Sequence, residues 1–549
     1  MKLKYIQIGA LILLLTAIIA CSESFLDSVP TNMVTTESYY QNDNDFITAI
    51  NGVYNALHEY RQNQDYFPMM ESATPCATQG SYGNARWKDY AWGGNGYTPS
   101  NSNMSTGWWR FWWRGIRRAS DVIDQVNKKG GVIKSAALRD RIQGEAHFLR
   151  AYNYFFLTYL YGDVPYITSA ADSIYPYRAP HAEIVNLMIA DLQMAETLLP
   201  SVTAYRGTEN IGRASKGSSI ALLGKIYCYE KRWAEAETEL KKLVATDDYQ
   251  LNANFVDQFT TINGENSNES IFEIQYIADQ GDDKVSAYAT FCGIGAADLG
   301  GDDDYDDSGF GYNEPTEYLT DMYQTKNGYD VTSTWVSNNA AQDFYSFSSA
   351  DPEFIPTNSF ANRDPRLMWT VMYEGSPYLA QNFPKNSFTA DDPPMQNYGT
   401  VKYIVLQNSS LNSGQNHIAI RYADMLLLLA EALMEQNKGS EAATFVNMVR
   451  SRPSVAMPDI PANVVANQIL LRDYIHKERI RELAMEFGHV YFDLIRWGVY
   501  SSEMNKYWTA GKHGNTNATQ ANFTATQNLW PIPQGERDLN KNLTQNPGY

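Results

Sequence analysis

Apolar residues recur at spacings of three and four along many stretches of this chain, and no other feature limits the fold as strongly. The pattern first appears at Phe46, Ile50, Val53 and Leu57. Side chains at these spacings lie on one face of an α-helix. The same period predicts helices over residues 138–161, 182–199, 215–230, 233–245, 420–436, 440–450 and 468–487. Strand-like runs are few and short, so a mainly α-helical fold is expected.

Two neighbouring predicted helices have the pattern of a helical hairpin. Leu223 and Gly224 lie on the first helix, and Trp233 and Leu240 lie on the second, with a short turn between them. Small residues let the helices approach while large residues fill the space, which resembles a tetratricopeptide hairpin. A second such hairpin is predicted over residues 421–450. Stacked hairpins bury one continuous core, so we expect one helical scaffold with tetratricopeptide-like hairpins rather than several domains.

Long irregular segments decorate this scaffold. The helical period fades over residues 276–415, where Asp, Asn, Gly and Ser dominate and several prolines interrupt regular structure. Such segments in compact proteins are more often functional than idle, so we interpret this one as a ligand-binding excursion. It separates an N-terminal helical region (46–275) from a C-terminal region (416–549). The N-terminal region follows a tether (21–45) and contains an aromatic loop (74–106).

The first residues have the features of a secretory signal peptide. Lys2 and Lys4 precede a nearly continuous apolar run over residues 5–20. A small residue followed at once by Cys21 is the pattern that lipoprotein signal peptidase requires. We therefore expect residues 1–20 to be removed and Cys21 to be lipidated; an ordinary buried thiol is the alternative. No later segment is long and apolar enough to span a bilayer, so the lipid is expected to anchor the protein to the membrane.

Charge and motif spacing exclude several classes of function. The formal net charge is −19, and no stretch clusters Lys and Arg densely enough to follow a phosphate backbone, which argues against nucleic acid as a partner. The seven His show no metalloprotease spacing, and there is no nucleophile elbow or phosphate-binding glycine loop. A glycoside hydrolase needs two carboxylates across a cleft, and 62 Asp and Glu residues do not single out such a pair. No motif in the sequence therefore indicates catalysis.

The sequence indicates no metal or cofactor. Cys76, Cys228 and Cys292 are too few and too widely spaced for a disulfide framework or a zinc site. The acidic run at residues 302–307 suggests calcium, but Asp307 stands where an EF-hand loop requires glycine. A solvated acidic loop is the better interpretation, and an ion site of another kind stays open.

Short motifs along the chain match one family in order. They are GEAHFLRA (144–151), YGDVP (161–165), RASKG (213–217), NRDPRL (362–367), RYAD (421–424), ERIRELA (478–484), DLIRWG (493–498) and LTQNPGY (543–549). Together they resemble the SusD/RagB family of outer-membrane lipoproteins over essentially the whole mature chain.

This resemblance implies a location and a function. It implies a SusD-like helical scaffold that is lipid-anchored in the outer membrane, exposed at the cell surface, and seated over a SusC-like TonB-dependent transporter. It also implies capture of oligosaccharides or polysaccharides for import, without catalysis. Peptide capture, as in some members, is the alternative ligand class, and a glycoside hydrolase is the alternative functional class.

The motif at residues 478–486 has charges at helical spacing. This spacing favours pairs such as Glu478 with Arg481 and Arg479 with Glu482, each worth only tenths of a kcal/mol on a helix surface. Apolar residues, among them Ile480, supply the opposite face that docks the helix. We interpret the motif as scaffold.

Six of the twelve tryptophans lie between residues 82 and 113. Trp109, Trp112 and Trp113 have helical spacing, so they are predicted to face a helix core. Trp87 and Trp92 lie instead among glycines without a helical period. A sugar ring presents an apolar C–H face and a rim of hydroxyls, so a sugar site needs flat aromatic surfaces beside polar side chains. The loop that contains Trp87 and Trp92 has both.

This loop is a candidate ligand platform. Its candidate binding residues are the aromatics Trp87, Tyr90 and Trp92 and the rim residues Asn84, Arg86 and Asp89. Aromatics that merely pin the loop onto the body are the alternative, and both interpretations stay open. Trp335 and Tyr345, in the loop-rich excursion, are the candidates that would complete the platform.

Overall fold

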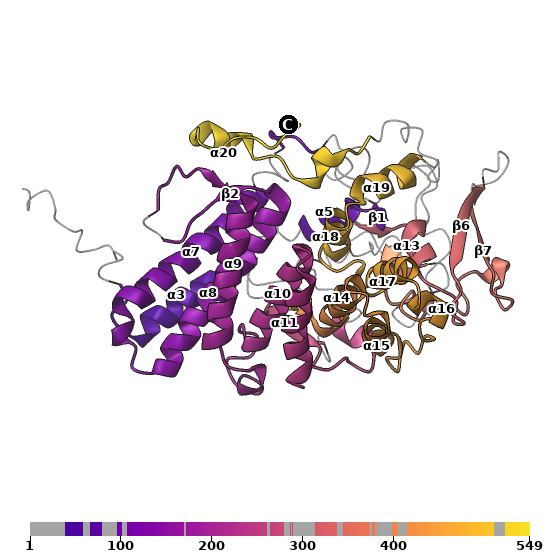
Figure 1. The fold of residues 1–549 in the computed structure, drawn as a ribbon, viewed down its shortest axis with the longest axis horizontal. Coiled ribbons are helices and arrows are strands. Elements are labelled where there is room, and N and C mark those ends of the chain that lie inside the picture. The colour runs from indigo at the N-terminus through magenta and orange to yellow at the C-terminus, as the bar shows by residue number, and fades with distance from the viewer. Residues whose placement is uncertain are drawn as a thin grey trace, which may run out of the picture.

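The structure is a computed structural model. It describes residues 39–58, 66–78, 96–101, 107–169, 172–260, 264–278, 286, 288, 292, 313–336, 344–373, 376–378, 381–382, 398–403, 414–509 and 522–549. Helices make up most of this part of the chain (Figure 1).

Four helices pack together in the N-terminal part. They are α3 (Asp43–Asn55), α7 (Trp108–Lys129), α8 (Ala136–Tyr161) and α9 (His181–Leu198). Helix α8 packs against α3, α7 and α9, and Figure 1 shows α7, α8 and α9 side by side. The apolar face predicted for α3 is buried, which explains why this short helix docks on α7 and α8.

Two helical hairpins follow the predicted pattern. The first joins α10 (Lys216–Tyr229) to α11 (Trp233–Ala245), and the second joins α14 (Tyr422–Glu435) to α15 (Gly439–Arg450). Helix α14 packs against α10, α11 and α17 (Gln468–Leu483), so the two hairpins share one core. The prediction of a mainly helical scaffold with tetratricopeptide-like hairpins is confirmed.

A glycine allows the close approach inside the first hairpin. A Cβ atom at Gly224 would lie 2.6 Å from Cδ2 of Leu240, which is shorter than any real contact. Leu240 therefore fills the space that the missing side chain leaves, as the spacing of small and large residues predicts.

The remaining elements are short. The other helices are α5 (Tyr66–Ser72), α13 (Glu317–Met322), α16 (Ala462–Val465), α18 (His489–Arg496), α19 (Tyr500–Thr509) and α20 (Gln534–Leu539). The described strands form antiparallel pairs: β1 (Ala77–Thr78) with β5 (Glu314–Pro315), β2 (Val164–Pro165) with β3 (Arg178–Ala179), β4 (Ser270–Ile274) with β12 (His417–Arg421), β6 (Val331–Val336) with β7 (Phe344–Ser349), β8 (Val371–Met372) with β11 (Gly399–Thr400), and β9 (Pro377–Tyr378) with β10 (Gln381–Asn382).

The motif at residues 478–486 is buried, which corrects its interpretation as a helix surface. The pair between Glu478 and Arg481 exists, with 3.0 Å between Oε2 and Nη1. The predicted pair between Arg479 and Glu482 is wrong, because Arg479 donates instead to Asp493, with 2.8 Å between Nε and Oδ2. The four charged side chains are at most 1% exposed, so the energies of exposed helix pairs do not apply to them.

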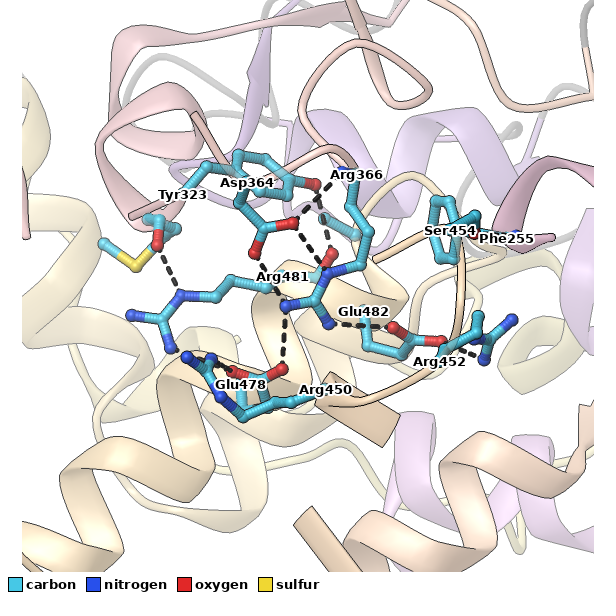
Figure 2. A network of polar contacts seen from close by, with 12 residues as sticks. Phe255, Tyr323, Asp364, Arg366, Arg450, Arg452, Ser454, Glu478, Arg481 and Glu482 are labelled. Carbon is cyan, nitrogen blue, oxygen red and sulfur yellow. Dashed lines mark hydrogen bonds and ion pairs between the residues drawn. The ribbon is translucent and has the colours of Figure 1, made fainter. Parts of the chain in front are cut away.

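Glu482 is the centre of a buried ion network around α17 (Figure 2). Its carboxylate accepts hydrogen bonds from Arg421 at 2.8 Å, Arg366 at 2.9 Å and Arg452 at 3.0 Å. Burial alone would raise the pKa of Glu482, but the three guanidinium groups outweigh burial and hold this pKa well below its ordinary value. The ionised carboxylate therefore ties three distant segments to α17.

Removing the charge of Glu482 is expected to destabilise the protein strongly. The Glu482→Gln variant would leave buried guanidinium groups without their common partner, which costs about 3 to 5 kcal/mol of unfolding free energy. Asp473→Asn is the control on the same helix, since the Asp473 side chain is 63% exposed and pairs with Lys477 at 2.9 Å. Its effect should stay below about 1 kcal/mol. Urea unfolding followed by circular dichroism measures both; equal stability of the two variants would contradict the assignment of Glu482 as the centre.

Candidate ligand-binding site

An aromatic pocket lies where the N-terminal end of α7 meets the residues that follow α3 and those that flank β4 and β12. The space between its described residues, including the open solvent at its mouth, amounts to about 550 Å³. The residues that line it are Leu57, His58, Trp108, Phe111, Trp112, Tyr276, Ser286, Tyr288, Tyr403, Gln415, Asn416, His417 and Phe487. Seven of these are Trp, Tyr or Phe, so the surface consists mainly of flat rings. We call this site the aromatic pocket.

Helix α7 supplies three rings of the aromatic pocket. Trp112 stacks on Phe156 of α8, with ring centroids 4.4 Å apart and an interplanar angle of 3°. Phe111 contacts the same indole with a centroid distance of 4.4 Å, and Trp108 does so at 5.5 Å. These contacts confirm the prediction that Trp112 faces a helix core. They also fix the ring before any ligand arrives, which lowers the entropy cost of binding.

Trp112, which lines the aromatic pocket, also has an unpaired hydrogen-bond donor. Its indole nitrogen Nε1 is buried and has no hydrogen-bond partner among the described residues. A buried donor in this condition costs about 1 to 3 kcal/mol, which a ligand oxygen would recover. Nε1 of Trp113 is in the same condition on the same helix, but Trp113 does not line the aromatic pocket.

Asn416 forms a fixed polar edge of the aromatic pocket. Its Nδ2 donates to Glu273 Oε2 at 2.9 Å and to Gln275 Oε1 at 3.0 Å. Its Oδ1 accepts from the backbone nitrogen of Tyr276 at 2.8 Å. Burial raises the pKa of Glu273 to about 7, although its hydrogen bonds act in the opposite direction. The amide is therefore held beside the rings by residues that lie behind the wall.

His417, in the wall of the aromatic pocket, is neutral at neutral pH. Burial, together with neighbouring His489, lowers the pKa of His417 well below its ordinary value. The neutral imidazole has one donor nitrogen and one acceptor nitrogen. The described lining residues include no Asp, Glu, Lys or Arg. Aromatic faces beside neutral donors and acceptors suit a ligand that has both apolar faces and hydroxyl groups.

The predicted loop platform lies outside the described residues. This applies to Asn84, Arg86, Trp87, Asp89, Tyr90 and Trp92, and also to Cys21. Tyr97, at the end of the same aromatic loop, is described and buried, and its hydroxyl lies 2.8 Å from that of Tyr500. Tyr97 therefore pins the end of the loop to the body.

The structure pairs Trp335 with Tyr345, but away from the aromatic pocket. The two residues are direct partners in the β6–β7 ladder. Tyr345 is buried with Val331 and Phe347, and burial raises the pKa of its hydroxyl. Figure 1 shows the hairpin at the opposite end of the molecule from α7. The burial of Tyr345 argues for a role in holding this hairpin together.

Little in the sequence indicates the pocket residues. Asn416, His417 and Phe487 come from segments distant from α7 in the chain, and none belongs to a ligand-binding motif. Trp112 was predicted as a core residue. Its second role, as part of the pocket wall, depends on the distant segments that the fold brings next to α7.

The described part of the chain contains neither a metal site nor a membrane-spanning helix. No group of three or more His, Cys, Asp or Glu residues there is placed to hold a metal ion. The acidic run at residues 302–307 lies outside that part. No helix within it combines the length and apolar character needed to cross a bilayer.

Comparison with known families agrees with this architecture. A model described as the SusD family matches residues 268–549, more than half of the chain. The chain belongs to the SusD family. A second model, described as starch-binding associating with outer membrane, matches residues 24–228 and associates the protein with the outer membrane. The resemblance to the SusD/RagB family is thereby confirmed.

Individual relatives cover the whole SusD-family chain. The SusD-like protein P2 of Formosa agariphila is 26% identical over 100% of both chains. A crystal structure of a SusD-like carbohydrate binding protein from Bacteroides fragilis has a TM-score of 0.75 and 22% identity, covering 92% of this chain and 99% of that one. Surface glycan-binding protein A from Bacteroides thetaiotaomicron, in complex with laminarihexaose, has a TM-score of 0.68 and 21% identity, with the same coverage. These structures establish the SusD-like fold.

Proposed function

We propose that this SusD-family protein captures oligosaccharides or polysaccharides at the cell surface and delivers them to a SusC-like TonB-dependent transporter for import. The aromatic pocket, with its neutral polar edge, is the observation that carries the glycan part. Support also comes from relatives described as carbohydrate binding or crystallised with laminarihexaose. The motifs that resemble SusD/RagB lipoproteins support the transporter as partner.

The chemistry of the pocket wall favours neutral sugars. The C–H face of a pyranose packs on an indole such as that of Trp112, while a hydroxyl accepts from its Nε1. Asn416 and His417 offer further neutral contacts at the edge. A uronate or sulfate group would lose its hydration with no cation among the described lining residues, which is costly.

We also propose that the aromatic loop and the loop-rich excursion extend the binding surface. Trp87, Tyr90 and Trp92 would supply further rings, and Asn84, Arg86 and Asp89 would bind sugar hydroxyls at their rim. Trp335 is proposed as a contact in the loop-rich excursion, with Tyr345 holding the hairpin that carries it. Capture of peptides is the alternative ligand class.

Binding assays on single variants test the glycan proposal. In Trp112→Phe the ring remains but the donor is lost, so affinity for the glycan identified on an array should fall about fivefold, the effect of about 1 kcal/mol. Trp113→Phe is the matched control and should bind normally. Trp87→Ala and Trp92→Ala each remove a stacking ring and should lose about thirtyfold, or about 2 kcal/mol. Calorimetric titration gives the affinities, and melting curves show whether each variant is folded.

Specific outcomes would contradict this assignment. Normal binding by Trp112→Phe would exclude the aromatic pocket as the glycan site. Normal binding by Trp87→Ala and Trp92→Ala, with lower melting temperatures only, would make the loop a scaffold. Binding to a peptide library but to no glycan would favour peptide capture, and release of reducing sugar would favour hydrolysis.

We further propose that Cys21 carries the lipid anchor. A Cys21→Ala variant is expected to lose incorporation of a fatty-acid probe in metabolic labelling, because no segment after residue 21 is apolar enough to hold a membrane. The variant should move to the soluble fraction, while a matched Cys76→Ala variant should keep the label. Label retained in Cys21→Ala would contradict the proposal. Protease treatment of intact cells separately tests exposure at the cell surface.

A further inference from the structure

The turn between α17 and α18 has an unfavourable backbone conformation. Met485, Phe487 and Gly488 all have positive φ, at 64°, 53° and 83°. Only glycine adopts this region without strain, because a Cβ atom there crowds the backbone. Phe487 nevertheless occupies it and lines the aromatic pocket. Contacts from elsewhere must therefore hold the turn in place.

Lys402 holds the first half of this turn. Its buried Nζ donates to the carbonyl oxygens of Glu482 at 2.8 Å and Ala484 at 2.9 Å, and to Oε1 of Glu486 at 2.7 Å. The first two hydrogen bonds satisfy carbonyls at the C-terminal end of α17, where helix carbonyls lack partners within the helix, and the third pairs Lys402 with a carboxylate of the turn. The turn is thereby attached to the segment that contributes the next residue, Tyr403, to the aromatic pocket.

Glu71 holds the second half of the turn. This residue lies on α5, and its Oε1 accepts a hydrogen bond from the backbone nitrogen of Gly488 at 2.8 Å. The neighbouring residue, Met70, lies so close that a Cβ atom at Gly488 would be 2.7 Å from Met70 Cε. The second carboxyl oxygen of Glu71 is buried without a hydrogen-bond partner among the described residues. The hydrogen bond from Gly488 thus ties this buried acid to the turn.

Phe487 transmits the position of the turn to the aromatic pocket. Its ring centroid lies 4.6 Å from that of Tyr403 and 5.4 Å from that of Tyr288. Both tyrosines also line the pocket. A shift of the backbone at residues 487–488 would therefore separate three rings of one wall.

We propose that Glu71 is a positioning residue for ligand binding: its hydrogen bond to Gly488 holds the strained turn so that Phe487 stays in the wall of the aromatic pocket. The effect on ligand affinity rests on the proposed function of the pocket. The effect on the turn itself does not.

The charge of Glu71 makes this arrangement sensitive to pH. Burial raises the pKa of Glu71 to about 7, and the neighbouring carboxylate of Glu486 adds to this rise. Lys402 and the backbone N–H groups of the turn lower the pKa of Glu71 and so oppose the rise. Cys76 and Tyr288 also face this carboxyl. A raised folded-state pKa means that the stability contributed by Glu71 is present below pH about 4.5 and is lost as pH rises through about 7. Ionisation of Glu71 therefore favours conformations in which water reaches its carboxylate. In these conformations the hydrogen bond to Gly488 is lost and the turn is released.

Variants at Glu71 test the proposal, with the array-identified glycan as ligand. Glu71→Ala should bind about tenfold more weakly at pH about 6, the effect of one lost buried hydrogen bond. Glu71→Gln keeps an acceptor for Gly488 without the charge, so it should bind like the wild type at pH about 6 and more tightly than the wild type at pH about 8. Glu145→Gln is the matched control, because burial raises the pKa of Glu145 to about 7 as well, and Glu145 pairs with Arg213 away from the pocket. It should change thermal stability with pH but not the pH profile of binding.

Hydrogen exchange at the turn needs no ligand. Amides in a peptide that covers residues 484–492 should exchange faster in Glu71→Ala, and faster in the wild type at pH about 8 than in Glu71→Gln at the same pH. Unchanged exchange in Glu71→Ala would overturn the proposal whether or not a glycan binds. Faster exchange with unchanged glycan affinity would overturn the positioning role and leave Glu71 a purely structural residue.

Discussion

The buried carboxylate of Glu482 joins segments that are far apart in the chain, and most of the C-terminal structure depends on it. Moving an ion from water into a protein interior costs several kcal/mol even after relaxation. Arginines offset that cost here because each guanidinium group has several donors in a fixed planar geometry, so one carboxylate can be saturated from several sides. Arg421 at the end of β12, Arg452 after α15 and Arg366 in a connecting segment all converge on Glu482. The network therefore specifies how hairpin, strand and loop meet.

The same network reaches the aromatic pocket. Arg421 also donates to Glu486, with 2.7 Å between Nε and Oε2, and Lys402 donates to the other oxygen of this carboxylate. Glu486 belongs to the strained turn that places Phe487. The strained conformation of this turn is thus held by ion pairs that also join the segments of the scaffold. This explains how a pocket assembled from distant segments keeps its rings in fixed positions.

The sequence predicted what depends on neighbouring residues. Helix α10 and its partner α11 were predicted nearly to the residue, because their apolar period and the small Gly224 are local features. The pairing of Arg479 was predicted wrongly, because spacing along a helix does not reveal whether the charged face meets water or another buried charge; Asp493 decides it. The pocket could not be predicted, since Asn416 and Trp112 become neighbours only through the fold. Helical spacing correctly placed Trp112 in a core, and its free Nε1 could be recognised only once the surroundings were known.

The carboxylates near the aromatic pocket are placed for a structural role rather than for hydrolysis. A glycosidase needs two carboxyl groups that face the sugar across a cleft. Glu273 instead accepts hydrogen bonds from Asn416 and from the backbone of Asn266, and Glu71 accepts from Gly488, so both acids are turned toward the protein behind the described wall. Their raised pKa values, which in an open cleft would favour a general acid, follow here mainly from burial. The acids near the described wall of the aromatic pocket therefore hold neutral groups in place.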